Sequence, residues 1–184
     1  ENRYALSTAA QQRAMFHQLR HELDETIDWS EQTRRIGHEQ DFPMRIVQAD
    51  IYRGWALARQ GDAAEGIELI ADGLARFRAA GARLNEAYYL GMYADALIEA
   101  GRPDDAVAAL GDAFDLVADT TRSYFYESEL HRICARARAA LGDLAGARAE
   151  LDTSRDVASA QQSPALVLRT DLDRLELELD DGDP

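Results

Sequence analysis

The chain has 184 residues, of which 46% are hydrophobic, and it carries a formal net charge of −14. This hydrophobic content is enough to build a core, so the composition excludes an intrinsically disordered chain. Nucleic acids and anionic membranes require a basic face, so the acidic charge argues against both, and a basic partner or simple solubility explains it better.

All 20 basic residues are arginines. The absence of lysine excludes P-loop proteins, Schiff-base enzymes and protein kinases, because each depends on a lysine. The single cysteine, Cys134, excludes an internal disulfide and fits a reducing compartment. No apolar run approaches the roughly 18 residues of a membrane span, and no secretory signal opens the chain. We therefore expect a cytoplasmic protein. The Arg- and Ala-rich composition without lysine suggests a bacterial origin. Because the first residue is Glu1 and not Met, we expect the chain to be a piece of a longer polypeptide.

The Ala-rich, Pro-poor composition predicts an all-α protein. Apolar residues recur at helical spacing, and glycines, prolines and capping residues separate the segments. A second helix capped by Asp24 should carry Ile27, Trp29 and Ile36, and Thr120 or Thr121 should cap the seventh. The other predicted helices span residues 4–22, 44–60, 63–80, 84–100, 103–119, 122–141, 144–159 and 165–179.

A repeat of about 40 residues runs through the chain. Gly61, Gly101 and Gly142 are 40 and 41 residues apart, a spacing in the range of helical repeat arrays. Small residues lie seven positions before each of these glycines and five and twelve positions after it. Small residues let two helices cross closely, so each glycine should mark the turn of an antiparallel helix pair, with Gly54 and Gly66 at one crossing.

These observations predict four antiparallel helix pairs followed by a capping helix. The predicted units are a degenerate repeat at 1–42, repeats at 43–82, 83–121 and 122–162, and the capping helix with an acidic tail at 163–184.

The pattern resembles tetratricopeptide repeats (TPRs), although its period is longer than the usual 34 residues. This family resemblance implies that the helix pairs form a right-handed superhelix. The segments 54–61, 81–84 and 127–132 are more specifically similar to the TPR region of bacterial signal-transduction ATPases, including regulators with class III nucleotidyl cyclase or LuxR-type domains. The resemblance covers residues 20–170. It implies a non-catalytic, regulatory module of a signalling protein, because the catalytic and DNA-binding residues of such proteins lie in other domains.

First helices line the concave face of such arrays, so their outward positions should form a groove for a protein or peptide, or for other domains of the parent chain. The predicted groove consists of Gln48, Ile51, Tyr52, Trp55, Arg59, Tyr88, Asp95, Glu99, Glu129, Arg132 and Arg136. Ordinary packing between helices is an equally good explanation for Trp55 and Tyr88, because large aromatic side chains are mostly buried.

Other functions have weaker support. His17 and His21 are spaced like metal ligands on one helix face, but two surface histidines explain them more simply. Glu127, Glu129, His131 and Arg132 could include an acid–base pair, although no nucleophile accompanies them, and a salt-bridge cluster is the better interpretation. Neither an enzyme nor a metal or cofactor site is therefore predicted. The remaining alternatives are a homodimerisation module and a small-molecule sensor with a pocket near Trp55, Tyr88 and Tyr124.

Overall fold

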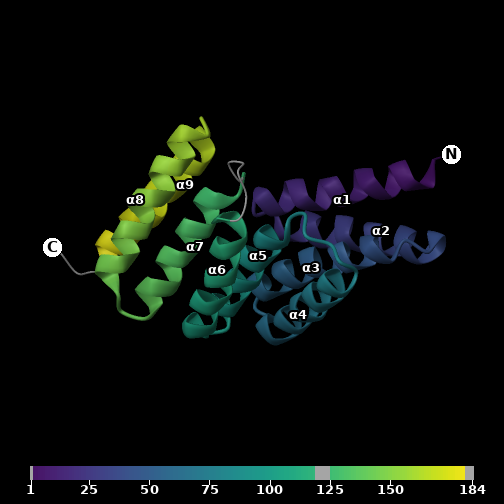
Figure 1. Cartoon of the computed structure of the whole chain (residues 1–184), viewed down its shortest axis with the longest axis horizontal. Coiled ribbons are helices and arrows are strands. Elements are labelled where there is room, and N and C mark those ends of the chain that lie inside the picture. The colour runs from purple at the N-terminus through teal and green to yellow at the C-terminus, as the bar shows by residue number, and fades with distance from the viewer. Residues whose placement is uncertain (1, 119–124, 181–184) are drawn as a thin grey trace.

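The computed structural model describes residues 2–118 and 125–180. Within these ranges the protein is all-α, as predicted, and its helices follow one another as antiparallel pairs from the N-terminal to the C-terminal end (Figure 1). The helices are α1 (Arg3–Leu19), α2 (Leu23–Gln40), α3 (Pro43–Gln60), α4 (Ala63–Ala79), α5 (Glu86–Glu99), α6 (Pro103–Ala118), α7 (Glu127–Ala140), α8 (Leu144–Ala160) and α9 (Pro164–Asp180).

The turn between the two helices of each pair is made by one residue in the left-handed conformation. Gly61, Gly101 and Gly142 have φ of 107°, 70° and 81°, as their repeat spacing predicts. His21, 40 residues before Gly61, has φ of 59° and makes the same turn without a glycine. Histidine is one of the few residues other than glycine that is enriched in this conformation. The first pair is therefore a complete unit with a substituted turn residue.

Several predicted helix ends were wrong for local reasons. The predicted helix 4–22 ends at Leu19, because the left-handed residue at position 21 stops it. Asp24 lies in the first turn of α2, and Glu22 holds the N-cap position. The helix predicted to start at residue 84 starts at Glu86, after Asn85 with φ of 70°. The predicted caps Thr120 and Thr121 lie outside the described residues.

The small residues lie at the helix crossings, as predicted. A Cβ atom added to Gly66 would lie 2.4 Å from the carbonyl oxygen of Gly54, and one added to Gly54 would lie 2.7 Å from that of Gly66. The two backbones are therefore in direct contact, and glycine is required at both positions. In the next two pairs the corresponding crossing residues are alanines, all buried: Ala94, Ala106, Ala135 and Ala147.

The first helices of successive pairs also contact one another. α1 contacts α3, α3 contacts α5, α5 contacts α7, and α7 contacts α9. We call the surface built by these five helices the first-helix face. α9 thus occupies the place of a first helix, and it packs against α8 as well as α7. This arrangement brings residues that are one repeat apart in the sequence next to one another.

Candidate interaction surface

Polar contacts join equivalent positions of successive first helices. The indole N–H of Trp55 donates to a carboxylate oxygen of Asp95 over 2.8 Å, and the two residues are 40 positions apart, which is one repeat. Further contacts between residues 40 or 41 positions apart are Gln11–Tyr52, Gln48–Tyr89, Arg59–Glu99, Asp95–Arg136, Glu129–Arg169 and Arg132–Asp173. The repeat period therefore also sets the pairing of charged and polar side chains between neighbouring units.

Asp95 is the centre of the first cluster of charges. It is 2% exposed, accepts the Trp55 hydrogen bond and forms ion pairs with Arg136 and Arg59. Burial would raise the pKa of Asp95, but Arg136, Arg59 and other cationic or N–H donors outweigh it and lower the pKa to about 2. Glu99 binds both arginines, at 2.8 Å from Arg59 and 2.9 Å from Arg136. This cluster joins α3, α5 and α7 through charges.

Glu129 is the centre of a second cluster. It is 1% exposed and accepts two hydrogen bonds of 3.0 Å from Arg132, one turn along α7, and one of 3.0 Å from Arg169 on α9. Arg132 also donates to Asp173 of α9 over 2.7 Å. Burial opposes ionisation of Glu129, yet the two arginines lower its pKa. The pair Glu129–Arg132 is the salt bridge expected from the sequence, and its extension to α9 fixes that helix on α7.

The end of α1 and the turn after it fill the middle of the first-helix face. The Tyr88 hydroxyl donates to the side-chain oxygen of Gln18, and Arg169 of α9 donates to the carbonyl oxygen of Leu19 over 2.7 Å. The His21 ring contacts the Trp55 ring edge-on at 5.5 Å. Burial, with added repulsion from the two arginines of the second cluster, lowers the pKa of His21 from 6.5 to about 4. The end of α1 and the uncharged ring of His21 therefore lie at the centre of this face.

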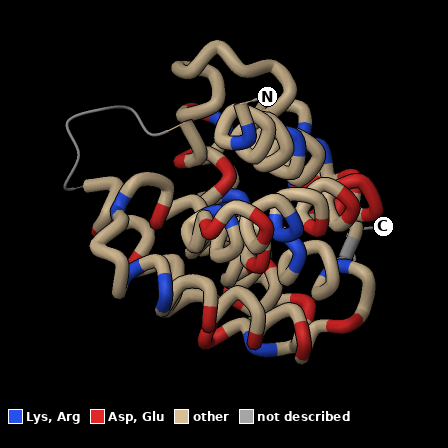
Figure 2. Tube along the Cα trace, turned by 90° about the vertical axis from the view of Figure 1, so that its right-hand side faces the viewer, with Lys and Arg blue, Asp and Glu red and all other residues tan. Residues whose placement is uncertain are grey.

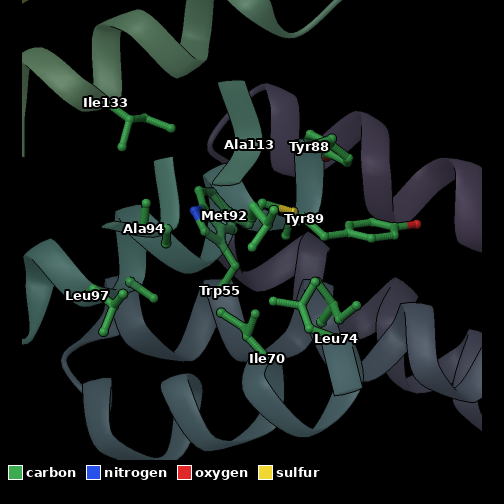
Figure 3. Packing of buried hydrophobic residues seen from close by; sticks show 14 of the residues in the cluster. Trp55, Ile70, Leu74, Tyr88, Tyr89, Met92, Ala94, Leu97, Ala113 and Ile133 are labelled. Atoms are coloured by element: carbon green, nitrogen blue, oxygen red, sulfur yellow. The ribbon is translucent and has the colours of Figure 1, made fainter. Parts of the chain in front are cut away.

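The predicted groove residues divide into three groups. The structure buries the apolar and aromatic members in the core: Ile51, Tyr52, Trp55 and Tyr88. Figure 3 shows Trp55 and Tyr88 among the packed hydrophobic side chains. Asp95, Glu129 and Arg132 are buried in the charge clusters. Gln48, Arg59, Glu99 and Arg136 are the members that reach solvent. Packing between helices accounts for the aromatic residues, and Tyr124 lies outside the described residues.

A hollow on the first-helix face lies between α5, α7, α8 and α9. Its volume is about 190 Å³. Its lining combines an apolar floor with a charged rim and consists of Ile98, Ala135, Arg136, Ala139, Leu151, Asp173, Glu176 and Leu177. Of the residues that line the hollow, only Arg136 was predicted from the sequence as a groove residue, because α9 was expected to be a capping helix. The 40-residue spacing of Glu129 and Arg169 was the signal that could have placed α9 on this face.

The histidine and acid–base candidates have structural partners. His21 lies beyond the end of α1, so it does not share a helix face with His17, which contacts Glu22 at 2.6 Å. His131, one of the acid–base candidates, contacts Glu150 of α8 at 2.7 Å, because this side of α7 faces α8. Over residues 2–118 and 125–180, no three His, Cys, Asp or Glu side chains gather as a metal site. In those ranges no helix is long and apolar enough to cross a membrane.

Basic and acidic positions alternate over the surface of the array (Figure 2). In this view arginine positions lie next to acidic positions along the described residues. Most of the arginines pair with carboxylates of the neighbouring helix or repeat, as the two clusters illustrate.

Comparison with known sequences agrees with this geometry. The family Tetratricopeptide repeat matches residues 47–71, 87–112 and 128–153, which cover α3–α4, α5–α6 and α7–α8. These three stretches match tetratricopeptide repeats. An uncharacterized protein of Rhizobium meliloti (strain 1021) is 32% identical over 123 residues, or 66% of this chain. The chain spans 12% of the length of that relative.

The fold is also similar to that of a solved TPR array. The structure of a Podosopora anserina protein named as a kinesin light chain with nearly identical TPR-like repeats matches with a TM-score of 0.63 and 19% identity, covering 97% of this chain and 92% of that one. A second solved structure, of a substituted form of the same protein, matches with a TM-score of 0.62 at the same identity and coverage. At this identity the likeness concerns the fold alone.

Proposed function

We propose that this chain is a non-catalytic regulatory module of a bacterial signalling protein, and that it binds a protein segment in the hollow of its first-helix face. TPR arrays generally mediate contacts between proteins. The observation that carries the proposal is the hollow itself, which leaves an apolar floor accessible between charged residues of α7 and α9.

The size of the hollow favours a peptide side chain over a small molecule. Its volume of about 190 Å³ is below the range of about 300–1,000 Å³ that is usual for small-molecule pockets. An apolar side chain can reach Ala139, Leu151 and Leu177, while Asp173 and Glu176 at the rim can attract a basic neighbour. The bound segment should therefore contain an apolar residue next to Arg or Lys, supplied by another protein or by another domain of the parent chain.

Binding in the hollow can regulate the parent protein. The hollow is lined by α5 of one repeat, by α7 and α8 of the next repeat, and by α9. A segment bound there contacts these units at once, so it stabilises the curvature that brings them together and shifts the equilibrium toward it.

Selection from a phage-displayed peptide library tests this proposal. The wild type should enrich one family of sequences with an apolar residue beside a basic one. Ala139→Leu fills the hollow and should weaken a selected peptide at least about tenfold, whereas Ala149→Leu, on the exposed side of α8, should leave its affinity unchanged. Failure to enrich any family, or equal binding to both variants, would contradict the proposal.

A further inference from the structure

α9 exposes a stripe of leucines that no described helix covers. Leu168, Leu172, Leu175 and Leu179 are 61%, 51%, 55% and 78% exposed, and at spacings of four, three and four residues they lie on one side of the helix. Four exposed leucines in one stripe differ from the scattered apolar residues of an ordinary surface and indicate a contact site. The opposite side of α9 is buried through Thr170 and Leu177.

The repeat identifies what normally covers these positions. The sequence Gly182-Asp183-Pro184 lies 40 residues after Gly142 and has the form of Gly101-Arg102-Pro103, which precedes the second helix α6. Counted back from Gly182, the four leucines occupy positions −14, −10, −7 and −3. The same positions counted back from Gly61 are Val47, Ile51, Gly54 and Ala58, all of which are buried.

In the α3–α4 pair the second helix is what buries these positions. A Cβ atom on Gly73 would lie 2.6 Å from Ile51, and one on Gly66 would lie 2.9 Å from the Cβ atom of Ala58. The stripe of α9 is therefore the side of a first helix against which a second helix packs.

The charges beside the stripe specify the occupant further. Glu176 and Glu178 lie on opposite sides of the stripe at 100° per residue, and both are exposed. Two copies of α9 packed together would bring these carboxylates against each other, which is unfavourable. A helix with basic residues on both edges of an apolar stripe would instead pair with them.

We propose that the leucine stripe of α9 is the docking site of an amphipathic α-helix with basic edges, held where a second helix lies in each complete repeat. Leu175 stands where the other pairs have Gly54, Ala94 and Ala135, so the docked helix must present a small residue opposite it. The four leucines do not line the hollow, which shares only Glu176 with this surface, so substitutions of the leucines test this proposal independently of the hollow.

The probe for this test is a fluorescein-labelled peptide of residues 62–80, the chain's own second helix α4, with its exposed acids Glu65, Glu68 and Asp72 replaced by Arg. It retains Gly66 and Gly73 as small residues. By fluorescence anisotropy, the peptide should bind the wild type saturably, and Leu172→Ser with Leu175→Ser should weaken binding at least about tenfold. The unmodified peptide 62–80, with its acidic edges, should bind more weakly than the arginine-bearing one.

Leu84→Ser provides the matched control, because Leu84 is 81% exposed but lies away from the stripe, before α5. It should bind the peptide like the wild type, and circular dichroism should show equal helicity in all variants. Absence of saturable binding, or equal binding to the stripe variant, would overturn the proposal. A dimer in light scattering that the stripe substitutions convert to monomer would also overturn it, since a second copy would then be the occupant.

Discussion

α3 and α9 are both first helices, yet the same positions have opposite environments in the two. Ile51 of α3 is fully buried beneath α4, whereas the equivalent Leu172 of α9 is 51% exposed. Gly54 is in backbone contact with Gly66, whereas the equivalent Leu175 is 55% exposed. The difference shows that small residues on α3 accompany its close contact with α4, whereas the pairing of charges along the first-helix face extends to α9, on which no described second helix packs at these positions.

The largest expected effect is the loss of a buried charge in the interior. Asp95→Ala leaves the Trp55 N–H, Arg136 and Arg59 without their shared partner, and it should lower the free energy of unfolding by about 3–5 kcal/mol. Urea denaturation followed by circular dichroism measures this value. A loss below about 1 kcal/mol, the value of an exposed pair, would show that the cluster does not hold the repeats together.

The next effect concerns the helix crossing in the interior. Gly66→Ala places a methyl group against the backbone of α3 and should destabilise the protein by about 1–3 kcal/mol, although alanine favours helices. Gly111→Ala is the matched control, because nothing lies within 4 Å of its added Cβ atom, and it should stabilise by about 0.5–1 kcal/mol. Equal effects of the two substitutions would refute the close crossing of α3 and α4.

Mild acid should destabilise the folded protein through His21, at the centre of the first-helix face. The pKa of His21 is about 4 in the folded protein and 6.5 when unperturbed, so the unfolded state binds the proton more readily. The contribution of neutral His21 to the free energy of unfolding is complete above pH 6.5 and is lost as the pH falls toward 4. Between pH 7 and 5 this should lower the free energy of unfolding by about 2 kcal/mol.

His21→Asn tests the assignment of this pH dependence. Asparagine tolerates the left-handed turn and does not titrate, so the loss between pH 7 and 5 should disappear. His38→Asn, at an exposed histidine of α2, is the control and should retain it. Asp95 and Glu129, whose pKa values are lowered, should contribute their losses only below about pH 4. A dependence that persists in His21→Asn would contradict the role assigned to this ring.

The smallest effect is expected at the solvent-exposed pair between α8 and α9. The carboxylate of Asp152 contacts Arg174, but its side chain is 67% exposed. Asp152→Ala should therefore change the free energy of unfolding by less than about 1 kcal/mol. A larger loss in urea denaturation would mean that exposed pairs, and not the Glu129 cluster, fix α9.

The sequence was sufficient to predict the helix pairs, because the small residues at Gly54 and Gly66 occupy positions that are again small and buried in the next two pairs. It also predicted the Glu129–Arg132 pair, which is local to one helix. The contacts of Gln18 with Tyr88 and of Leu19 with Arg169 were not predictable, since they join residues 70 and 150 positions apart with no repeated pattern. His21 was not predicted as a turn residue, because the turns were predicted from the spacing of glycines.

The central claim is that a second helix covers α3 and not α9. The substitutions Ile51→Ala and Leu172→Ala test it most directly, since they shorten the side chain at the same repeat position in a covered and an uncovered first helix. Urea denaturation should show a loss of about 2–5 kcal/mol for Ile51→Ala and a change within about 0.5 kcal/mol for Leu172→Ala. Equal losses would contradict the account, because they would mean that α9 is already covered in the isolated chain.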